Sequence, residues 1–258
     1  METTADTGGV RSVERALAIV DLLGEHQALG LEELHYLTAL PKATVSRMLA
    51  TLQEQGWVFR GLSDRRYRLS ARRLFGDRQL RFKRRLVESA APMLLELSER
   101  TGLVADLSCF DGERLEVMES AVPQVLRKRY PHTCQIVGQH ASLFHSAMGR
   151  ACLGELAEAE VQRLAAAHER LGDEALLRDI EEEANKGFGQ RTEGHWEYPV
   201  RLPFLIRAIA LPVHAEGRLA GSIALHWPLD QAPVERVSSL HLSSLATTVG
   251  EVQRALAV

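Results

Sequence analysis

Small, hydroxyl and basic side chains recur between residues 42 and 50 at spacings that suit contact with the edges of nucleic-acid bases. From Lys42 to Gly56 the apolar residues follow the spacing of one buried helix face, namely Val45, Met48, Leu49 and Leu52. The opposite face then carries Ala43, Ser46, Arg47 and Ala50. Small residues with one arginine can lie close to the base edges of a major groove. This segment therefore predicts a recognition helix.

The neighbouring segments predict the elements that would position this helix. Before it, leucines recur every three residues at 31, 34, 37 and 40, and Pro41 suits the start of a new helix. After it, residues 57–59 and 67–69 read as two strands joined by a turn over residues 61–64. The predicted hairpin carries four arginines that suit phosphate contacts, Arg60, Arg65, Arg66 and Arg68. Together these elements form a winged helix-turn-helix.

The charge distribution favours nucleic acid over the alternative, a small helical domain whose arginines only keep it soluble. Residues 1–86 hold 15 Lys+Arg against 10 Asp+Glu, whereas residues 87–258 hold 16 against 24. A basic first third followed by an acidic remainder is typical of one domain that meets a polyanion and one that does not.

Length and charge together predict two domains in the 258 residues. We expect a disordered N-terminus over 1–9, a DNA-binding domain over 10–70, a linker helix over 71–86 and an effector-binding and oligomerisation domain over 87–258. A solvated linker is the alternative for 71–86, because Gly76 weakens a helix by about 1 kcal/mol relative to Ala. The first helix is expected to begin at Ser12 and to bury Val13, Leu17, Val20 and Leu23.

The C-terminal part predicts an α+β domain. Strands over 103–110 and 115–118 flank an Asp111-Gly112 turn, and strands over 206–213 and 219–227 flank Glu216-Gly217. Helices are expected over 146–154, 158–170, 173–186 and from 233 to the end, where Leu240 is among the expected core residues. Antiparallel strand pairs with helices to one side can enclose a small-molecule pocket.

Composition predicts a cytoplasmic protein that neither crosses nor binds a membrane. The start METTADTGGVRS lacks an apolar segment, and no run approaches the roughly 18 apolar residues of a membrane span. Three cysteines without CxxC spacing, Cys109, Cys134 and Cys152, indicate a reducing compartment.

In the order and spacing of its motifs, the chain from about residue 10 to its end resembles the IclR family of bacterial transcription regulators. The N-terminal motifs are Ser12-Val13-x-Arg15-Ala16-Leu17, Leu40-Pro41-Lys42-x-Thr44-Val45-x-Arg47, Gly56-Trp57-Val58 and Tyr67-Arg68-Leu69. The C-terminal motifs are Ser146-Ala147-Met148-Gly149-Arg150-Ala151-x-Leu153, Gly187-Phe188-Gly189 and Ile209-Ala210-Leu211-Pro212-Val213. Residues 141–149 further resemble the subgroup that controls the catabolism of aromatic acids.

The resemblance implies a winged helix-turn-helix domain joined by a linker helix to a GAF-like effector domain. It also implies a dimer or tetramer that binds a palindromic operator in double-stranded DNA under the control of a small organic acid. The DNA contacts carried over are Lys42, Ala43, Thr44, Ser46 and Arg47 on the helix and Arg65, Arg66 and Arg68 on the wing.

The expected effector site combines the start of one helix with the second predicted hairpin. Ser146, Ala147, Met148 and Gly149 would present backbone N–H groups to a carboxylate, although an ordinary helix cap explains the same residues. In place of the family's aspartate after Pro-Val, this chain has His214, with Ala224 and His226 expected opposite on the returning strand. Histidines beside Trp227 would suit an aromatic acid.

Catalysis and metal binding have weaker support. His132, Cys134, His140, His145 and Cys152 cluster in the sequence without the paired spacing of a zinc site, so we expect neither a metal nor a cofactor. No G-x-S-x-G nucleophile motif occurs, and residues 217–222 do not form a phosphate-binding loop. An enzyme with a DNA-binding arm and an architectural DNA binder without an effector remain the alternatives.

Overall fold

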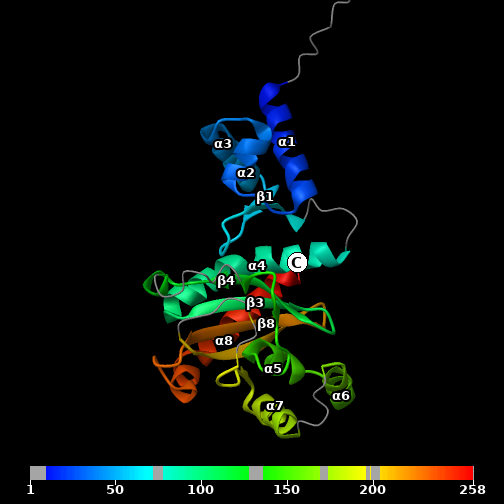
Figure 1. Cartoon of the computed structure of the whole chain (residues 1–258), viewed down its shortest axis with the longest axis vertical. Helices are drawn as coiled ribbons and strands as arrows, with labels where there is room; N and C mark the ends of the chain where they lie inside the picture. The colour runs from blue at the N-terminus through cyan, green and yellow to red at the C-terminus, as the bar shows by residue number, and fades with distance from the viewer. Residues whose placement is uncertain are drawn as a thin grey trace, which may run out of the picture. The chain divides into compact units, whose positions relative to one another are not determined.

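The computed structural model describes residues 10–71, 78–127, 136–168, 174–195, 198 and 204–257. The chain divides into two compact units, Met1–Arg84 and Arg85–Val258. The first contains three helices and a small hairpin, and the second contains a larger sheet with its helices (Figure 1).

The first unit is the helix-turn-helix and wing that the sequence predicts. Its helices are α1 (Arg11–His26), α2 (Leu31–Thr38) and α3 (Lys42–Glu54). Strands β1 (Val58–Arg60) and β2 (Tyr67–Leu69) pair in antiparallel orientation. Buried apolar side chains hold these elements together, and the most deeply buried of them, at most 1% exposed, are Ile19, Leu23, Leu34, Val45 and Leu49.

The expected core face of α1 is wrong in part. Val13 and Leu17 are about half exposed, at 53% and 50%, whereas Ile19 and Leu23 are fully buried. The helix carries two rows of apolar residues at helical spacing, and only the row that contains Ile19 and Leu23 packs into the core. The helix also begins after Val10, with no side-chain cap, rather than after Ser12.

Helix α4 (Arg78–Thr101) runs without a break through the boundary between the two units. Its first residues belong to the segment predicted as a linker helix, and residues 72–77, including Gly76, lie outside the described residues. Over residues 78–86 the segment is therefore a helix rather than a solvated linker.

The second unit is built on a six-stranded antiparallel sheet in the order β5-β4-β3-β8-β7-β6. The two predicted hairpins are β3 (Val104–Phe110) with β4 (Leu115–Ala121), and β7 (Ile206–Ala215) with β8 (Arg218–Pro228). They join through the pairing of β3 with β8 at the centre of the sheet. The short strands β5 (His140–Ala141) and β6 (Gly189–Gln190) form the edges.

Helices cover both faces of this sheet, which corrects the expectation that they pack on one side. One face carries Ala208, Ala210 and Ala224 and packs against α5 (Ala147–Leu153), with α6 (Glu158–Ala167) and α7 (Glu174–Lys186) in the same core. On the opposite face Ile209 and Leu225 are also fully buried. Helix α8 (Val234–Leu256) contacts β7 and β8 and covers that face.

Two further features complete the second unit. A 3₁₀ turn, η2 (Gln124–Leu126), follows β4. Leu240 of α8, expected in the core, is 59% exposed.

Among the described residues, none of the helices combines the length and apolarity that crossing a membrane requires.

Candidate functional site

The outer face of α3 is the candidate surface for reading bases. Ala43, Ser46 and Arg47 are exposed, as is Lys42 at the first helical position, and Thr44 is half-buried. Val45 and Leu49 fix this orientation, because they point into the core and are fully buried. Lys42 Nζ forms an exposed ion pair with Glu32 Oε2 at 2.6 Å.

The turn of the wing is organised by Asp64. Its Oδ1 accepts hydrogen bonds from the backbone N–H of Arg66 and from Arg68 Nη1, both at 3.0 Å. Gly61 N–H donates to the Arg66 carbonyl at 2.9 Å and closes the turn. Burial disfavours ionised Asp64, but the hydrogen bonds and charges of Arg68 and Arg66 outweigh it and lower the Asp64 pKa.

A second carboxylate, from α2, holds another wing arginine. Arg66 Nη2 donates to both oxygens of Glu33 at 2.6 Å, and the Gly30 backbone N–H donates to Glu33 Oε2 at 2.6 Å. The hydrogen bond from Gly30, followed by those from Arg66 and its charge, lowers the Glu33 pKa despite partial desolvation. Of the three arginines predicted as wing contacts, Arg66 and Arg68 are thus engaged with carboxylates of their own unit.

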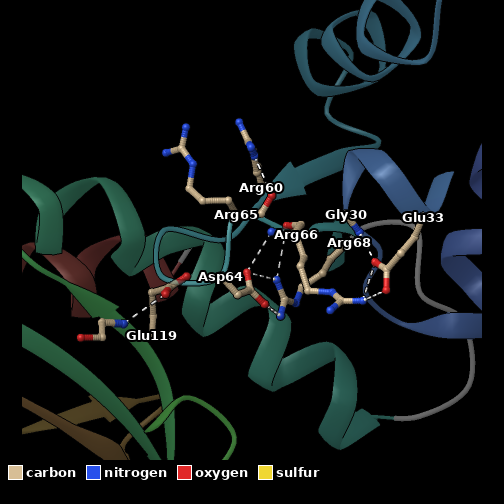
Figure 2. A network of polar contacts seen from close by, with 9 residues as sticks. Gly30, Glu33, Arg60, Asp64, Arg65, Arg66, Arg68 and Glu119 are labelled. Carbon is tan, nitrogen blue, oxygen red and sulfur yellow. Dashed lines mark hydrogen bonds and ion pairs between the residues drawn. The ribbon is translucent and has the colours of Figure 1, made fainter. Parts of the chain in front are cut away.

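Arg60 and Arg65 are the wing arginines that remain available for a phosphate. Figure 2 shows their guanidinium groups directed away from the pairs formed by Arg66 and Arg68. Arg60 Nε donates to the Arg65 carbonyl at 2.7 Å, and Arg65 adopts a left-handed backbone conformation with φ of 58°. Neither arginine forms an ion pair with any part of the chain that the structure describes. The sequence pattern places Arg60 in the hairpin, whereas the family resemblance carries over only Arg65, Arg66 and Arg68 as wing contacts.

The second candidate site is a small cavity between the sheet and α5. It has a volume of about 20 Å³, and its wall includes five of the seven predicted effector residues, Ser146, Ala147, Met148, Ala224 and His226. The wall also includes residues that the sequence reasoning missed, among them Asp106, Arg191 and Tyr198.

A buried ion-pair geometry lies at this cavity. His226 Nδ1 is 2.8 Å from Asp106 Oδ2, and the two side chains are 6% and 4% exposed. Across the β3–β8 pairing, His226 lies opposite Val104 and Asp106 lies opposite Ala224. Ala224 is on the face of the sheet that packs against α5, so the side chains of Asp106 and His226 also face α5. Arg191 is 6% exposed and donates from Nη2 to the His195 carbonyl at 2.6 Å.

Ser146 caps α5 as the sequence predicts. Its Oγ accepts from the Gly149 N–H at 2.9 Å and donates to the Ser142 carbonyl at 2.6 Å. The hydroxyl thus uses its one donor and one of its two acceptor positions within the protein, as in an ordinary helix cap.

Gly149 and His214 are not part of the cavity wall. A Cβ on Gly149 would lie 2.3 Å from the Leu143 carbonyl oxygen, so the glycine permits a close backbone approach. His214 lies past a register shift in β7, pairs with Leu219 rather than with Ala224 or His226, and has Nε2 3.4 Å from Glu155 Oε2.

A buried network supports the segment that carries Arg191. Arg150 Nη2 lies 2.8 Å from Glu183 Oε1, and Arg150 Nη1 donates to Thr192 Oγ1 at 2.9 Å. Glu183 Oε2 accepts from the Gln190 N–H at 2.7 Å. Burial raises the Glu183 pKa, although the Gln190 hydrogen bond and the Arg150 charge oppose this effect.

The His/Cys cluster of the sequence does not form a site in the described residues. These residues contain no group of three or more His, Cys, Asp or Glu side chains placed to hold a metal ion, and His132 and Cys134 lie outside them. Cys109 and Cys152 are buried free thiols, and burial raises the pKa of Cys152 to about 12. A thiol with this pKa is protonated at neutral pH and is a poor nucleophile.

Comparison with known proteins covers both units. A family model for the IclR helix-turn-helix domain matches residues 12–60, and one for the C-terminal domain of bacterial transcriptional regulator IclR matches residues 82–254. The HTH-type transcriptional regulator BhcR of Paracoccus denitrificans is 26% identical over 97% of this chain and 88% of its own length. KdgR of Escherichia coli, also an HTH-type transcriptional regulator, is 25% identical over 91% of this chain and 90% of its own length.

Solved structures show the same fold. The IclR structure from Thermotoga maritima superposes with a TM-score of 0.55 at 16% identity, over 96% of this chain and 99% of that one. An IclR-family regulator from Brucella abortus gives 0.54 at 18% identity, over 99% and 95%. With both domain models matched in order along the sequence, the protein belongs to the IclR family and is a transcriptional regulator rather than an enzyme.

Proposed function

We propose that this regulator binds a palindromic operator as a dimer or tetramer, and that a small organic acid bound in the C-terminal unit changes its affinity for that operator. The observation that carries the DNA half is the composition of the exposed α3 face. Small side chains beside Arg47 allow close approach to base edges, while the core residues beneath keep the helix rigid. As operator DNA is cytoplasmic in bacteria, we place the protein there.

We assign different roles to the basic residues of the first unit. Arg47 and Ser46 would contact bases, and Lys42 and Thr44 would contact the backbone near the start of α3. Arg60 and Arg65 would meet phosphates, since no carboxylate in the described part of the chain holds their guanidinium groups. Arg66 and Arg68 would instead fix the shape of the wing, because Glu33 and Asp64 hold them.

Direct DNA binding tests this assignment. Fluorescence anisotropy of the full chain should show at least about a thousandfold preference for its own upstream intergenic DNA over a scrambled duplex. Arg47→Ala should weaken binding to the natural duplex by about 1–3 kcal/mol and scarcely change binding to the scrambled one. The control is Arg178→Ala in α7, which removes an exposed arginine from the other unit and should leave both affinities unchanged.

Equal affinity for the two duplexes across a range of salt concentrations would contradict sequence-specific regulation through this DNA. It would favour the architectural DNA binder.

The proposed binding of a small organic acid rests on the cavity at α5. Arg191 brings buried positive charge to it, and His226 provides a hydrogen-bonding ring. Its volume of about 20 Å³ has room for about one water-sized group and is far below the roughly 150 Å³ of a cavity that holds benzene. Any acid would enter only if wall residues moved, and an aromatic acid would require the larger movement. This observation favours a small acid.

A matched pair of histidine variants tests the location of the site. Thermal shifts are measured with a panel of aliphatic and aromatic acids. His226→Ala should abolish the stabilisation that a bound acid produces, whereas His214→Ala should retain it, because His214 lies outside the cavity. Loss of the shift in His214→Ala but not in His226→Ala would place the effector elsewhere.

A further inference from the structure

We infer that the cavity at α5 recognises a hydrogen-bond donor on the effector, so that the effector is a small acid that also carries a hydroxyl or ammonium group. The inference rests on the proposed effector function and defines the chemical class of the ligand more narrowly. Its basis is the carboxylate of Asp106, a residue that no motif of the sequence singled out.

Asp106 lies in β3 at the centre of the sheet and is 3% exposed. Its Oδ2 is occupied by His226 Nδ1 at 2.8 Å. Its Oδ1 is buried and has no hydrogen-bond partner within the part of the chain that the structure describes. A carboxylate oxygen accepts hydrogen bonds, and a buried one without a donor is disfavoured. The missing partner must therefore be a donor.

The surroundings of Asp106 leave space for such a donor on the side of the cavity. Ala224 is its partner across the β3–β8 pairing, and Ala210 is the next partner in the sheet, on β7. Both are small residues, so neither of these two sheet neighbours fills the region beside the carboxylate. The cavity that Asp106 lines holds about 20 Å³, which is room for one group of the size of a water molecule. A hydroxyl or an ammonium group has this size, whereas the rest of the ligand would enter only as wall residues moved.

The same wall supplies a positive charge. Arg191 lines the cavity and is 6% exposed. A buried carboxylate that accepts and a guanidinium that donates are complementary to one molecule that bears both a donor and an anionic group. Hydroxy acids and amino acids have this combination, and simple carboxylic acids lack the donor.

Ser120 is the residue of the protein itself that could serve as the donor. It stands opposite Asp106 on β4, and its buried Oγ also has no hydrogen-bond partner among the described residues. If its hydroxyl rotated towards Asp106, the carboxylate would be satisfied without a ligand. The Ser120→Ala variant separates these two explanations, because it removes this donor and leaves the cavity wall intact.

The test compares acids that differ only by the donor. Glycolate and glycine are compared with acetate, lactate and alanine with propionate, and mandelate with phenylacetate, by calorimetric titration of the full chain. A site built to hydrogen-bond a ligand group discriminates strongly against an analogue without that group. We expect the member with the donor to bind at least tenfold more tightly in any pair that binds.

Two variants test whether Asp106 causes the preference for acids that carry a hydrogen-bond donor. Asp106→Asn keeps the shape of the side chain but removes its charge, and should reduce the preference to less than threefold. Ser120→Ala should retain the full preference. Thermal melting of both variants checks that they fold. If Asp106→Asn does not fold, the comparison of ligands on the unaltered chain still tests the proposal.

The outcomes separate the two proposals. If acids with and without the donor bind the unaltered chain equally, the donor site is wrong while the effector function stands. If the preference disappears in Ser120→Ala but persists in Asp106→Asn, Asp106 is not the recognising group. If no member of any pair binds, the proposed acid effector fails, and the donor site fails with it.

Discussion

The division of the wing arginines into two kinds makes a quantitative prediction for the salt dependence of DNA binding. Each phosphate neutralised by a basic residue contributes about 0.9 to the slope of log affinity against log salt. Among the described residues, no carboxylate holds the guanidinium of Arg65. Arg65→Ala should therefore reduce the slope by about 0.9 per protomer, or about 1.8 for two protomers on a palindrome.

The size of this effect is large enough to measure. Raising the salt concentration from about 50 to about 200 mM changes its logarithm by about 0.6, so a slope difference of about 1.8 corresponds to about a twelvefold difference in relative affinity. Alanine is the appropriate replacement at Arg65 because it keeps a Cβ and hence the strain of the left-handed backbone, with φ of 58°.

Glu33→Gln makes the opposite prediction. Glu33 holds Arg66 through both carboxylate oxygens at 2.6 Å. Removing the carboxylate charge should release Arg66 towards DNA and steepen the slope by up to about 0.9 per protomer. The assay is fluorescence anisotropy on a non-specific duplex over a salt series, with thermal melting to confirm folding. An unchanged slope in Arg65→Ala, together with a reduced one in Arg66→Ala, would refute the division.

Three further predictions concern stability and acid sensitivity. Leu49→Ala should destabilise the protein by about 2–5 kcal/mol in urea unfolding, because Leu49 is fully buried, whereas Leu17→Ala on the half-exposed face of α1 should cost much less. Because the Asp64 pKa is lowered in the folded protein, its stabilising effect should be complete above the unfolded pKa of about 3.9 and lost as the pH falls through the folded value. Asp64→Asn should thus be less stable than the unaltered protein at pH 7, with a difference that shrinks towards pH 3 in thermal melts; a constant difference would argue against this linkage. Arg150→Met should reduce stability, since it leaves the Glu183 carboxylate buried without its cation at 2.8 Å, and Arg150→Met/Glu183→Leu should recover part of the loss.

Local patterns predicted the elements of the first unit well because their determinants are local. The spacing of Val45 and Leu49 defines which face of α3 is buried, and the turn before Tyr67 defines the hairpin. Helix α1 was less predictable, since it carries two apolar stripes and only packing selects between them. In the second unit the two hairpins were predicted from their turns, but their pairing through β3 and β8 joins residues more than a hundred positions apart.

The candidate sites depend on contacts that a sequence pattern does not reveal. The sequence pattern predicts that Arg66 contacts DNA, because its partner, Glu33, is distant in the sequence and lies on helix α2. His214 was expected opposite His226, but the tight turn after Ala215 and the register shift at Val213 pair it with Leu219. Asp106 gave no signal, because one carboxylate in an apolar strand is informative only once its neighbours are known.

The central claim is that α3 reads a defined DNA sequence as part of a symmetric oligomer. Repeated selection of duplexes from a random pool by the full chain tests this claim directly, since the pool contains every candidate half-site. We expect recovery of an inverted repeat with half-sites about one helical turn, or a multiple of it, apart, and loss of the enrichment in Arg47→Ala. A pool that stays random after several rounds, while the protein still binds DNA, would contradict the claim.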